Sequence, residues 1–204
     1  MRITGPSDVH NRHKKSIPDQ VKEVIRISDI ILETLDARSI NKSRIPELEA
    51  LIKEQNKLLV HVITKIDLLP DKKVPDETLK SLCLPLAISA KSKQGISSLR
   101  KRIYILSKKF NQHAQVHVGI IGYPNTGKSS LINILARRAV APVSSHPGFT
   151  KGIRKIRFAK SILLLDTPGT IPSNENLFSE DQRKHAFLGI HAPENVKNPD
   201  LILM

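Results

Sequence analysis

The chain has few of the residues that define several classes of protein. A single cysteine, Cys83, among 204 residues excludes an internal disulfide framework and a zinc site built from cysteines. Because Cys83 follows an apolar helical stretch, the sequence predicts a small core residue there. No apolar run approaches the ~20 residues that cross a bilayer, and the first residues contain no apolar signal core. We therefore expect a cytoplasmic protein with no membrane partner.

Aromatic and acidic residues are also scarce. Only 3% of the residues are aromatic and none is Trp, which argues against recognition of single-stranded bases by stacking. Lys and Arg number 33 against 19 Asp and Glu, so the net charge is +14. A chain this basic is expected to bind polyanions, with nucleic acid as the default candidate, and contact with the backbone of a folded RNA fits best. Charge alone does not separate RNA from DNA or an anionic membrane.

The most informative segment is VHVGIIGYPNTGKSSL, residues 116–131. Gly122, Gly127, Lys128 and Ser129 satisfy the phosphate-binding P-loop pattern G-x-x-x-x-G-K-[ST]. An apolar strand precedes the loop and an apolar-periodic helix follows it, which is the context that the pattern requires. In such a loop the backbone N–H groups and the helix N-terminus face the phosphates. Lysine then reaches the β- and γ-phosphates and the serine hydroxyl binds Mg²⁺.

Apolar patterns predict strands alternating with helices. Strands are expected at 30–36, 58–63, 85–89 and 116–121, and a hairpin is expected to pair 153–158 with 161–166. Helices are expected within 17–27, at 47–56, 76–82 and 96–109, after the P-loop, and at 179–188. This alternation predicts an α/β fold with a mostly parallel, doubly wound sheet, whose ligands bind where the strands end.

Two short segments resemble the guanine-binding motifs of GTPases. Thr64-Lys65-Ile66-Asp67 follows a predicted strand and is similar to Asn-Lys-x-Asp, with Thr in place of the commoner Asn. A carboxylate at Asp67 would accept hydrogen bonds from both guanine donors, a pair that adenine lacks. Ser89-Ala90-Lys91 would supply a backbone N–H to the guanine oxygen.

Two further positions concern Mg²⁺ and the γ-phosphate. Asp166 and Gly169 match D-x-x-G, in which the carboxylate holds Mg²⁺ through water and the glycine N–H senses the γ-phosphate. Thr150 lies between the P-loop and this motif, which makes it the candidate for the mobile threonine that closes on Mg²⁺.

The order of these motifs is unusual. The guanine motifs precede the P-loop, whereas ordinary Ras-like GTPases place them after it. Together with Asp36-Ala37-Arg38, this order resembles the circularly permuted GTPases of the YlqF/YawG type. The resemblance runs through LDARSINKSRIPELE, TKID, SAKSKQGI, GYPNTGKSSLIN, PGFTKG and LLLDTPG, nearly the whole chain. It implies a Ras-like P-loop GTPase domain with permuted motif order.

The resemblance also implies a function. Members of this family are GTPases of ribosome assembly that act mostly on the large subunit. We therefore expect a GTP-binding and GTP-hydrolysing switch that docks on ribosomal RNA or a pre-ribosomal particle. The alternatives are a GTPase of another RNA-related process and an RNA-binding scaffold whose nucleotide is structural.

Two details bear on hydrolysis. Thr170 stands where Ras-like enzymes have a water-orienting Gln, so we expect slow hydrolysis without a partner. Asn125 resembles the P-loop asparagine that helps to bind K⁺ in potassium-dependent GTPases. An Asn chosen for turn geometry explains the same position equally well.

The chain is expected to divide into a basic N-terminal helix or arm (1–27), the permuted GTPase domain (28–175) and a C-terminal helical segment (176–204). That last segment would be the start of a further, truncated domain or the end of a protein without one. The expected cofactors are GTP or GDP, Mg²⁺ and, if the potassium interpretation holds, K⁺. The expected catalytic residues are Lys128, Thr150 and Gly169, and the expected metal ligands are Ser129, Thr150 and Asp166 for Mg²⁺ and Asn125 for K⁺. The expected nucleotide-binding residues are Thr64, Lys65, Asp67, Ser89, Ala90, Lys91, Gly122, Tyr123, Pro124, Asn125, Thr126, Gly127, Lys128, Ser129, Ser130, Asp166 and Gly169.

Overall fold

The fold is that of a computed structural model, which describes residues 19–110, 115–137 and 153–167. Thr150, Gly169 and the expected helix at 179–188 lie outside the described residues. None of the helices in the described ranges is long and apolar enough to cross a membrane.

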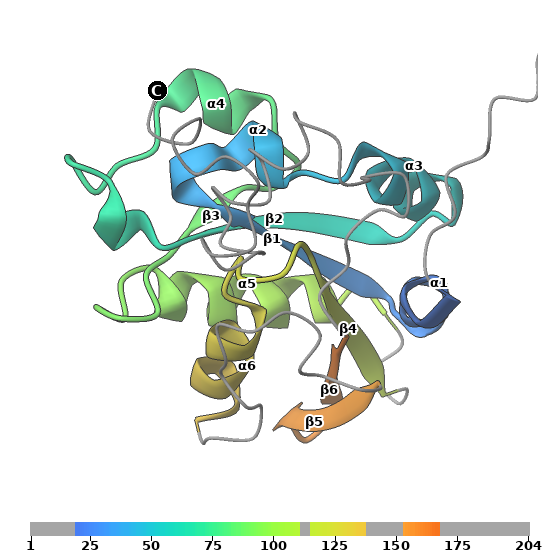
Figure 1. Cartoon of the computed structure of the whole chain (residues 1–204). Helices are drawn as coiled ribbons and strands as arrows, with labels where there is room; N and C mark the ends of the chain where they lie inside the picture. The colour runs from blue at the N-terminus through green and yellow to red at the C-terminus, as the bar shows by residue number, and fades with distance from the viewer. Residues whose placement is uncertain (1–18, 111–114, 138–152, 168–204) are drawn as a thin grey trace, which may run out of the picture.

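Six strands form one sheet in the order β3-β2-β1-β4-β6-β5 (Figure 1). All neighbouring strands are parallel except β5 and β6, which pair as the expected antiparallel hairpin. The mostly parallel sheet predicted from the sequence is therefore confirmed. The strands are β1 (Ile30–Asp36), β2 (Leu58–Thr64), β3 (Leu86–Ala87), β4 (Val116–Ile121), β5 (Arg154–Ala159) and β6 (Ile162–Asp166).

The strand order gives the sheet a point where the direction of winding reverses. The chain builds β1, β2 and β3 outward toward one edge, returns to the centre as β4, and then builds β6 and β5 toward the other edge. In doubly wound sheets, ligands bind beyond the carboxyl ends of the strands at this reversal. Here it lies between β1 and β4, so the P-loop that follows β4 is in the expected place.

Helices cover both faces of the sheet in two layers (Figure 1). One face packs against α5 and α6 in the largest apolar cluster, and every residue of β1 in the middle of the sheet is buried. The other face packs against the remaining helices in two smaller clusters. The helices are α1 (Asp19–Ile27), α2 (Ile40–Ser43), α3 (Pro46–Glu54), α4 (Asp76–Lys80), α5 (Ile96–Ser107) and α6 (Lys128–Ala136), with short 3₁₀ turns at η1 (Ala37–Ser39) and η2 (Ile66–Leu68).

Local sequence explains where these helices form. α3 starts at Pro46, whose missing N–H costs nothing at the first helical position, and its first turn carries acidic residues. α1 buries Val21 and Ile25 against the sheet. It packs closely on β4 because Gly119 has no side chain, and a Cβ there would lie 2.6 Å from Ser28 Oγ. The helix expected near the start of the chain therefore packs on the sheet.

Three details differ from the sequence-based expectations. β3 covers only Leu86–Ala87 of the strand expected at 85–89, and residues 37–43, expected as loop, form η1 and α2. The prediction that Cys83 lies in the core is wrong, because its side chain is exposed. Cys83 lies on the segment before the edge strand β3, where its backbone N–H and carbonyl bond His61 of β2 and its side chain faces solvent.

Candidate functional site

The P-loop wraps around the point where β4 ends. Gly122 has a φ of +142°, and a Cβ there would lie 2.4 Å from Thr34 Oγ1 and 2.7 Å from the Thr34 carbonyl oxygen. Gly127, with a φ of +89°, caps α6, which begins at Lys128. Only glycine fits the first of these positions, since both its backbone angle and its surroundings exclude a side chain. The loop therefore presents backbone N–H groups next to a helix N-terminus, the arrangement that binds phosphate.

Lys128 is buried at the first turn of α6. Its Nζ donates to the Gly122 carbonyl oxygen at 2.9 Å and to the Tyr123 carbonyl oxygen, so the amine closes the loop on itself. Burial lowers the pKa of Lys128 to about 7, and the neighbouring Asp166 carboxylate opposes that shift. A phosphate in the loop would act in the same direction as Asp166 and keep the amine charged.

Asp166 ends β6 beside the P-loop. The register pairs Asp166 with Ile120, which places the carboxylate next to the strand that leads into the loop. The side chain is 1% exposed, and neither carboxylate oxygen has a hydrogen-bond partner among the described residues. Burial raises the pKa of Asp166, with Lys128 and Arg154 opposing it. Buried carboxylates are usually paired or bound to metal, so these oxygens are suited to a cation held with phosphate.

A second register brings the guanine-type motif to the same edge. Asp36 at the end of β1 pairs with Thr64 at the end of β2, and Lys65 follows in a left-handed conformation. Lys65 Nζ donates to Asp36 Oδ2 at 2.8 Å, and Arg38 holds the same carboxylate through Nε and Nη2. Burial by itself would raise the pKa of Asp36, but the bonds from Arg38 and Lys65 hold it below its usual value. The Asp-Ala-Arg segment thus fixes the stem of Lys65.

Hydroxyl groups tie this edge to the P-loop. Thr64 Oγ1 lies 2.7 Å from the Thr126 carbonyl oxygen and 3.1 Å from that of Leu35. Thr34 Oγ1 lies 2.7 Å from Thr126 Oγ1, which in turn donates to the Tyr123 carbonyl oxygen. All these groups are buried. The ends of β1 and β2 are therefore joined to the loop after β4 by direct hydrogen bonds.

A pocket of about 650 Å³ opens where these segments meet. It combines the ends of the second and third strands with the start of α6, three segments that lie far apart in the sequence. Its size suits a ligand of nucleotide dimensions. It is lined by Thr64, Lys65, Asp67, Leu68, Ile88, Ala90, Lys91, Gly127, Ser130, Leu131, Asn133 and Ile134.

Five further expected nucleotide-binding residues do not line this pocket, and the structure shows the burial, the contacts or the backbone conformation of each of them. Tyr123 is 1% exposed and packs in the apolar cluster under α1 and α3, so only its backbone reaches the loop. Ser89 is buried, and its Oγ accepts the Ser92 N–H at 3.0 Å, which closes the turn that presents Ala90. Pro124 is buried and Ser129 is half-buried in the first turn of α6. Asn125 has a φ of +60°, a conformation that Asn tolerates, so its backbone fits the turn interpretation, and its proposed role in binding K⁺ stays a prediction.

The sequence did not single out several residues of this site. Asn133 and Ile134 line the pocket from α6, and Thr34 holds the P-loop from β1. Asp36 and Arg38 were noted as part of the family resemblance without a role. One feature of the sequence could have pointed to Asp36 and Arg38. Asp-Ala-Arg ends one predicted strand just as Lys-Ile-Asp follows the end of the next, so the two segments were expected at the same edge of a parallel sheet.

Comparison with known proteins finds similarity over most of the chain. The family described as 50S ribosome-binding GTPase matches residues 117–204. Nucleolar GTP-binding protein 2 of Eremothecium gossypii is 33% identical over 94% of this chain and 39% of its own length. An uncharacterized GTP-binding protein of Methanocaldococcus jannaschii is 36% identical over 92% of this chain and 49% of its own length. The chain thus spans less than half of each of these two relatives.

Solved structures share the fold. YlqF from T. maritima in its GNP-bound form superposes with a TM-score of 0.61 at 23% identity, over 88% of this chain and 68% of that one. Its GDP-bound structure gives a TM-score of 0.62 over the same share of this chain and 69% of its own. The likeness at this identity concerns the fold.

Proposed function

We propose that this chain, a circularly permuted P-loop GTPase by its motif order and its fold, binds GTP and hydrolyses it to GDP and phosphate as a switch in ribosome assembly. The observation that carries the proposal is the convergence of the guanine-type and phosphate-type segments at one pocket, joined by the 2.7 Å contact between Thr64 Oγ1 and the Thr126 carbonyl oxygen. Neither the guanine-type segments nor the P-loop would be sufficient by itself to recognise a guanine nucleotide. Together they supply a base-binding end and a phosphate-binding end.

At the base end, the proposed contacts come from three residues. Asp67 accepts from the two guanine donors, Lys65 lays its stem along the base, and the Ala90 N–H donates to the guanine oxygen. Asp36 and Arg38 position Lys65 through the bonds described above. Thr64, which replaces the commoner Asn, positions the P-loop.

At the phosphate end, the loop N–H groups and Lys128 hold the β- and γ-phosphates. Thr150 and Gly169 are proposed to close on the γ-phosphate, and both lie outside the described residues. The residues present fit Mg²⁺, since Asp166 offers two buried oxygens without hydrogen-bond partners in the described ranges and Ser129 lies in the first turn of α6. When bound, Mg²⁺ neutralises charge on the phosphate oxygens.

Hydrolysis is proposed to be slow in the isolated protein. Thr170 stands in place of a water-orienting Gln, so a partner must supply or order the missing groups. Single-turnover hydrolysis with and without ribosomal particles measures this, and a substantial rate from the protein alone contradicts it. For Asn125, the potassium interpretation requires that hydrolysis fall when K⁺ is replaced by Na⁺. An equal rate in the two salts leaves turn geometry as its role.

The proposal of a ribosomal partner is supported by the net charge of the chain and by the names of its relatives. The matching family is described as 50S ribosome-binding and a matching relative as nucleolar, so we propose a large-subunit particle or its RNA as the target. The net charge of +14 suits that target. The expected cytoplasmic location stays a prediction, because relatives named nucleolar act elsewhere in eukaryotic cells.

The test is co-sedimentation with purified ribosomal subunits and their precursors, with a non-hydrolysable GTP analogue compared with GDP. Moderately high salt is required, because a +14 protein binds any RNA at low salt. Binding to one particle only in the GTP-like state supports the switch. Equal binding in both states favours an RNA-binding scaffold with structural nucleotide, and binding to no particle removes ribosome assembly while leaving GTP binding intact.

A further inference from the structure

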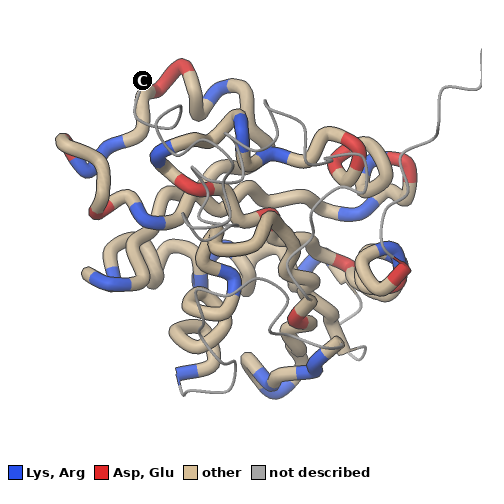
Figure 2. Tube along the Cα trace, viewed as in Figure 1, with Lys and Arg blue, Asp and Glu red and all other residues tan. Residues whose placement is uncertain are grey.

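In the part of the chain that the structure describes, the side of the sheet covered by α5 and α6 has no acidic residues on its helices. Between Glu77 and Asp166 the sequence contains no aspartate or glutamate, and this segment includes all of α5, α6 and β5. Figure 2 shows Lys and Arg but no Asp or Glu along these three elements. The opposite layer contains acidic residues among its cations, and some of them pair, as Lys22 does with Asp19 and Arg44 with Glu49. The positive charge that is not neutralised is therefore concentrated on the α5 side.

The outer side of α5 carries exposed lysines that form no ion pair with the described residues. Its apolar residues at 96, 99, 103 and 106 face the sheet, so Lys101 points outward and is exposed, as are Lys108 and Lys109 at its end. Among the described residues these three lysines make no ion pair. Lys101 and Lys108 are seven residues apart, which places them about 10 Å apart on one side of the helix.

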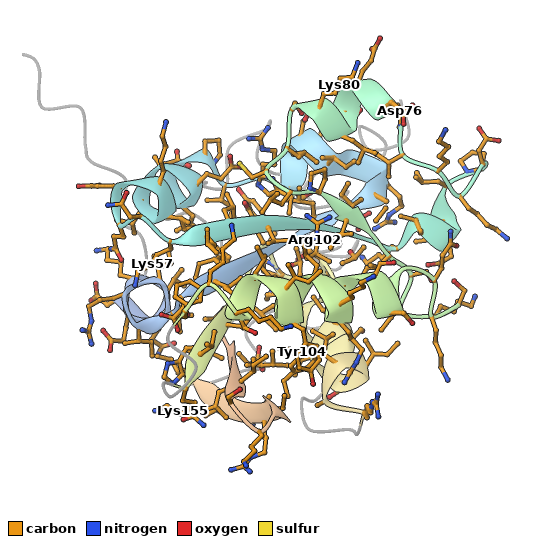
Figure 3. All side chains as sticks on the ribbon, turned by 180° about the vertical axis from the view of Figure 1, so that it is seen from behind. Lys57, Asp76, Lys80, Arg102, Tyr104 and Lys155 are labelled. Carbon is orange, nitrogen blue, oxygen red and sulfur yellow. The ribbon has the colours of Figure 1, made fainter. Side chains whose placement is uncertain are left out.

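A fourth cation on this helix has a structural role. Arg100 donates to the Leu135 carbonyl oxygen at 2.6 Å and lies 4.6 Å from the centre of the Phe158 ring. The exposed Tyr104 ring packs against the same Phe158, with 5.4 Å between ring centroids. Arg100 thus fixes α5 against α6 and β5. Figure 3 shows α5 lying across this face, with Tyr104 between it and β5. The surface is held rigidly before any partner arrives.

We propose that this surface, made of Lys101, Tyr104, Lys108 and Lys109 on α5 and its end, docks the phosphate backbone of a double-stranded segment of RNA. Unpaired lysines on a rigid helix suit regularly spaced phosphates, which backbone recognition of duplex RNA requires. The single exposed tyrosine offers no platform for a run of stacked bases. Tyr104 and Ile105 are the large apolar side chains that α5 exposes, and two neighbouring residues do not form the continuous apolar face that an amphipathic membrane helix needs.

The helix that carries this surface starts near the proposed nucleotide pocket, since Lys91 lines the pocket and α5 begins a few residues later at Ile96. This inference deepens the proposed function, since it names the face that meets the ribosomal particle. It does not depend on which particle is the target.

The experiment compares two variants of equal charge. The α5 variant is K101Q/K108Q/K109Q, and the control is K53Q/K73Q/K80Q, which removes three exposed lysines from α3, α4 and the loop before α4 in the other layer. Binding is measured with a fluorescent RNA duplex over a salt series and with ribosomal particles in the presence of a GTP analogue. Nucleotide binding is measured in parallel with a fluorescent GTP analogue and should be unchanged in both variants.

We expect the α5 variant to bind the duplex at least about tenfold more weakly, with a salt slope smaller by about 2 to 3, and the control to bind nearly as well as the parent chain. An equal loss in both variants, or no loss in the α5 variant, overturns the proposal. Loss of binding to phosphatidylserine vesicles with unchanged RNA binding overturns it in favour of a membrane. If the parent chain binds the duplex through α5 but no ribosomal particle, the proposed function fails and this inference stands.

Discussion

At the scale of single residues, Thr64 connects the end of β2 to the P-loop, the two ends of the proposed nucleotide site. The commoner residue at this position is Asn, yet here a buried hydroxyl contacts the carbonyl oxygen of Thr126 in the P-loop. A hydroxyl that satisfies a buried carbonyl contributes about 1 kcal/mol, and leaving the carbonyl without a partner costs about 1–3 kcal/mol. The loop conformation is therefore sensitive to this side chain.

The substitution Thr64→Val removes the hydroxyl and keeps the shape. We expect the free energy of unfolding to fall by about 1–2 kcal/mol and GTP affinity to fall about fivefold or more, because the P-loop loses its support. Thr64→Ser keeps the hydroxyl and serves as the control. Urea unfolding and titration with a fluorescent nucleotide check both effects, and unchanged affinity in the valine variant contradicts a positioning role.

Substitution of Asp67 tests whether this residue recognises guanine. Its carboxylate lines the pocket beside Lys65 and Ala90. Asp67→Asn replaces an acceptor with a donor, so preference should move from guanosine to xanthosine nucleotides, with GTP affinity lower by about a hundredfold. Asp71→Asn, at an exposed loop position, is the matched control. Competition between GTP and XTP measures the change, and equal GTP affinity in the parent and the variant disproves the assignment.

At the scale of elements, a buried polar network joins β1, β2 and α3. His61 Nδ1 accepts the Cys83 N–H at 2.8 Å, so the ring proton is on Nε2, 3.1 Å from Glu33 Oε2. Glu33 also accepts the Ile45 N–H, and Glu49 of α3 pairs with Arg44. Glu33, Glu49 and His61 are close enough to hold a metal ion. Because both ring nitrogens and the Glu49 carboxylate already have partners, we read the cluster as structural.

Acid should weaken this network through Glu49. Burial would raise the pKa of Glu49, but the bonds from Arg44 and His61 lower it to about 2 from 4.5. A lowered folded-state pKa stabilises the protein above pH 4.5, and that contribution is lost as the pH falls from 4.5 toward 2. We expect Glu49→Gln to lower the free energy of unfolding at pH 7 by about 1–3 kcal/mol. The difference from the parent chain should shrink at pH 3.

Glu54→Gln, at an exposed position of the same helix, is the control for that prediction. Its unfolding free energy should follow the parent chain at both pH values. Urea unfolding at pH 7 and pH 3 makes the comparison. A Glu49→Gln deficit of the same size at both values shows that packing of α3, and not the charge of Glu49, stabilises this part of the fold.

At the scale of the whole molecule, nucleotide and metal should stabilise the fold as one unit. The pocket takes residues from both sides of the point where the winding of the sheet reverses, so ligand joins the β1–β3 half to the β4–β6 half. GDP with Mg²⁺ at a hundred times its dissociation constant adds about 2.7 kcal/mol. For a chain of this length, that raises the unfolding midpoint by about 5–10 °C.

Removal of the metal tests the role of Asp166. EDTA should reduce the nucleotide-dependent rise in the parent chain. Asp166→Asn should abolish the part that depends on Mg²⁺ and stabilise the nucleotide-free protein, because it removes a buried charge without a hydrogen-bond partner in the described part of the chain. Thermal unfolding with GDP, with and without Mg²⁺, measures all of these. A variant that still responds fully to Mg²⁺ excludes Asp166 as a ligand.

The sequence by itself determined most of the helices and strands and predicted a phosphate site. The apolar patterns predicted β1, β2, β4, α5 and the β5–β6 hairpin, because local periodicity shows which side of each element is buried. The P-loop pattern predicted a phosphate site after β4, since glycine and lysine are required there for local reasons.

Only the tertiary structure decided which distant groups meet. The pairing of Asp36 with Thr64, the bond from Lys65 to Asp36 and the contact of Thr64 with Thr126 depend on the register of parallel strands, which no local pattern encodes. The exposure of Cys83 depends on the path of an edge segment across the surface. The basic face likewise exists because α5 and α6, which contain no acid, cover the same face of the sheet, while the helices with acidic residues (α1, α3 and α4) cover the other. Local sequence selects each element, whereas long-range packing selects its neighbours.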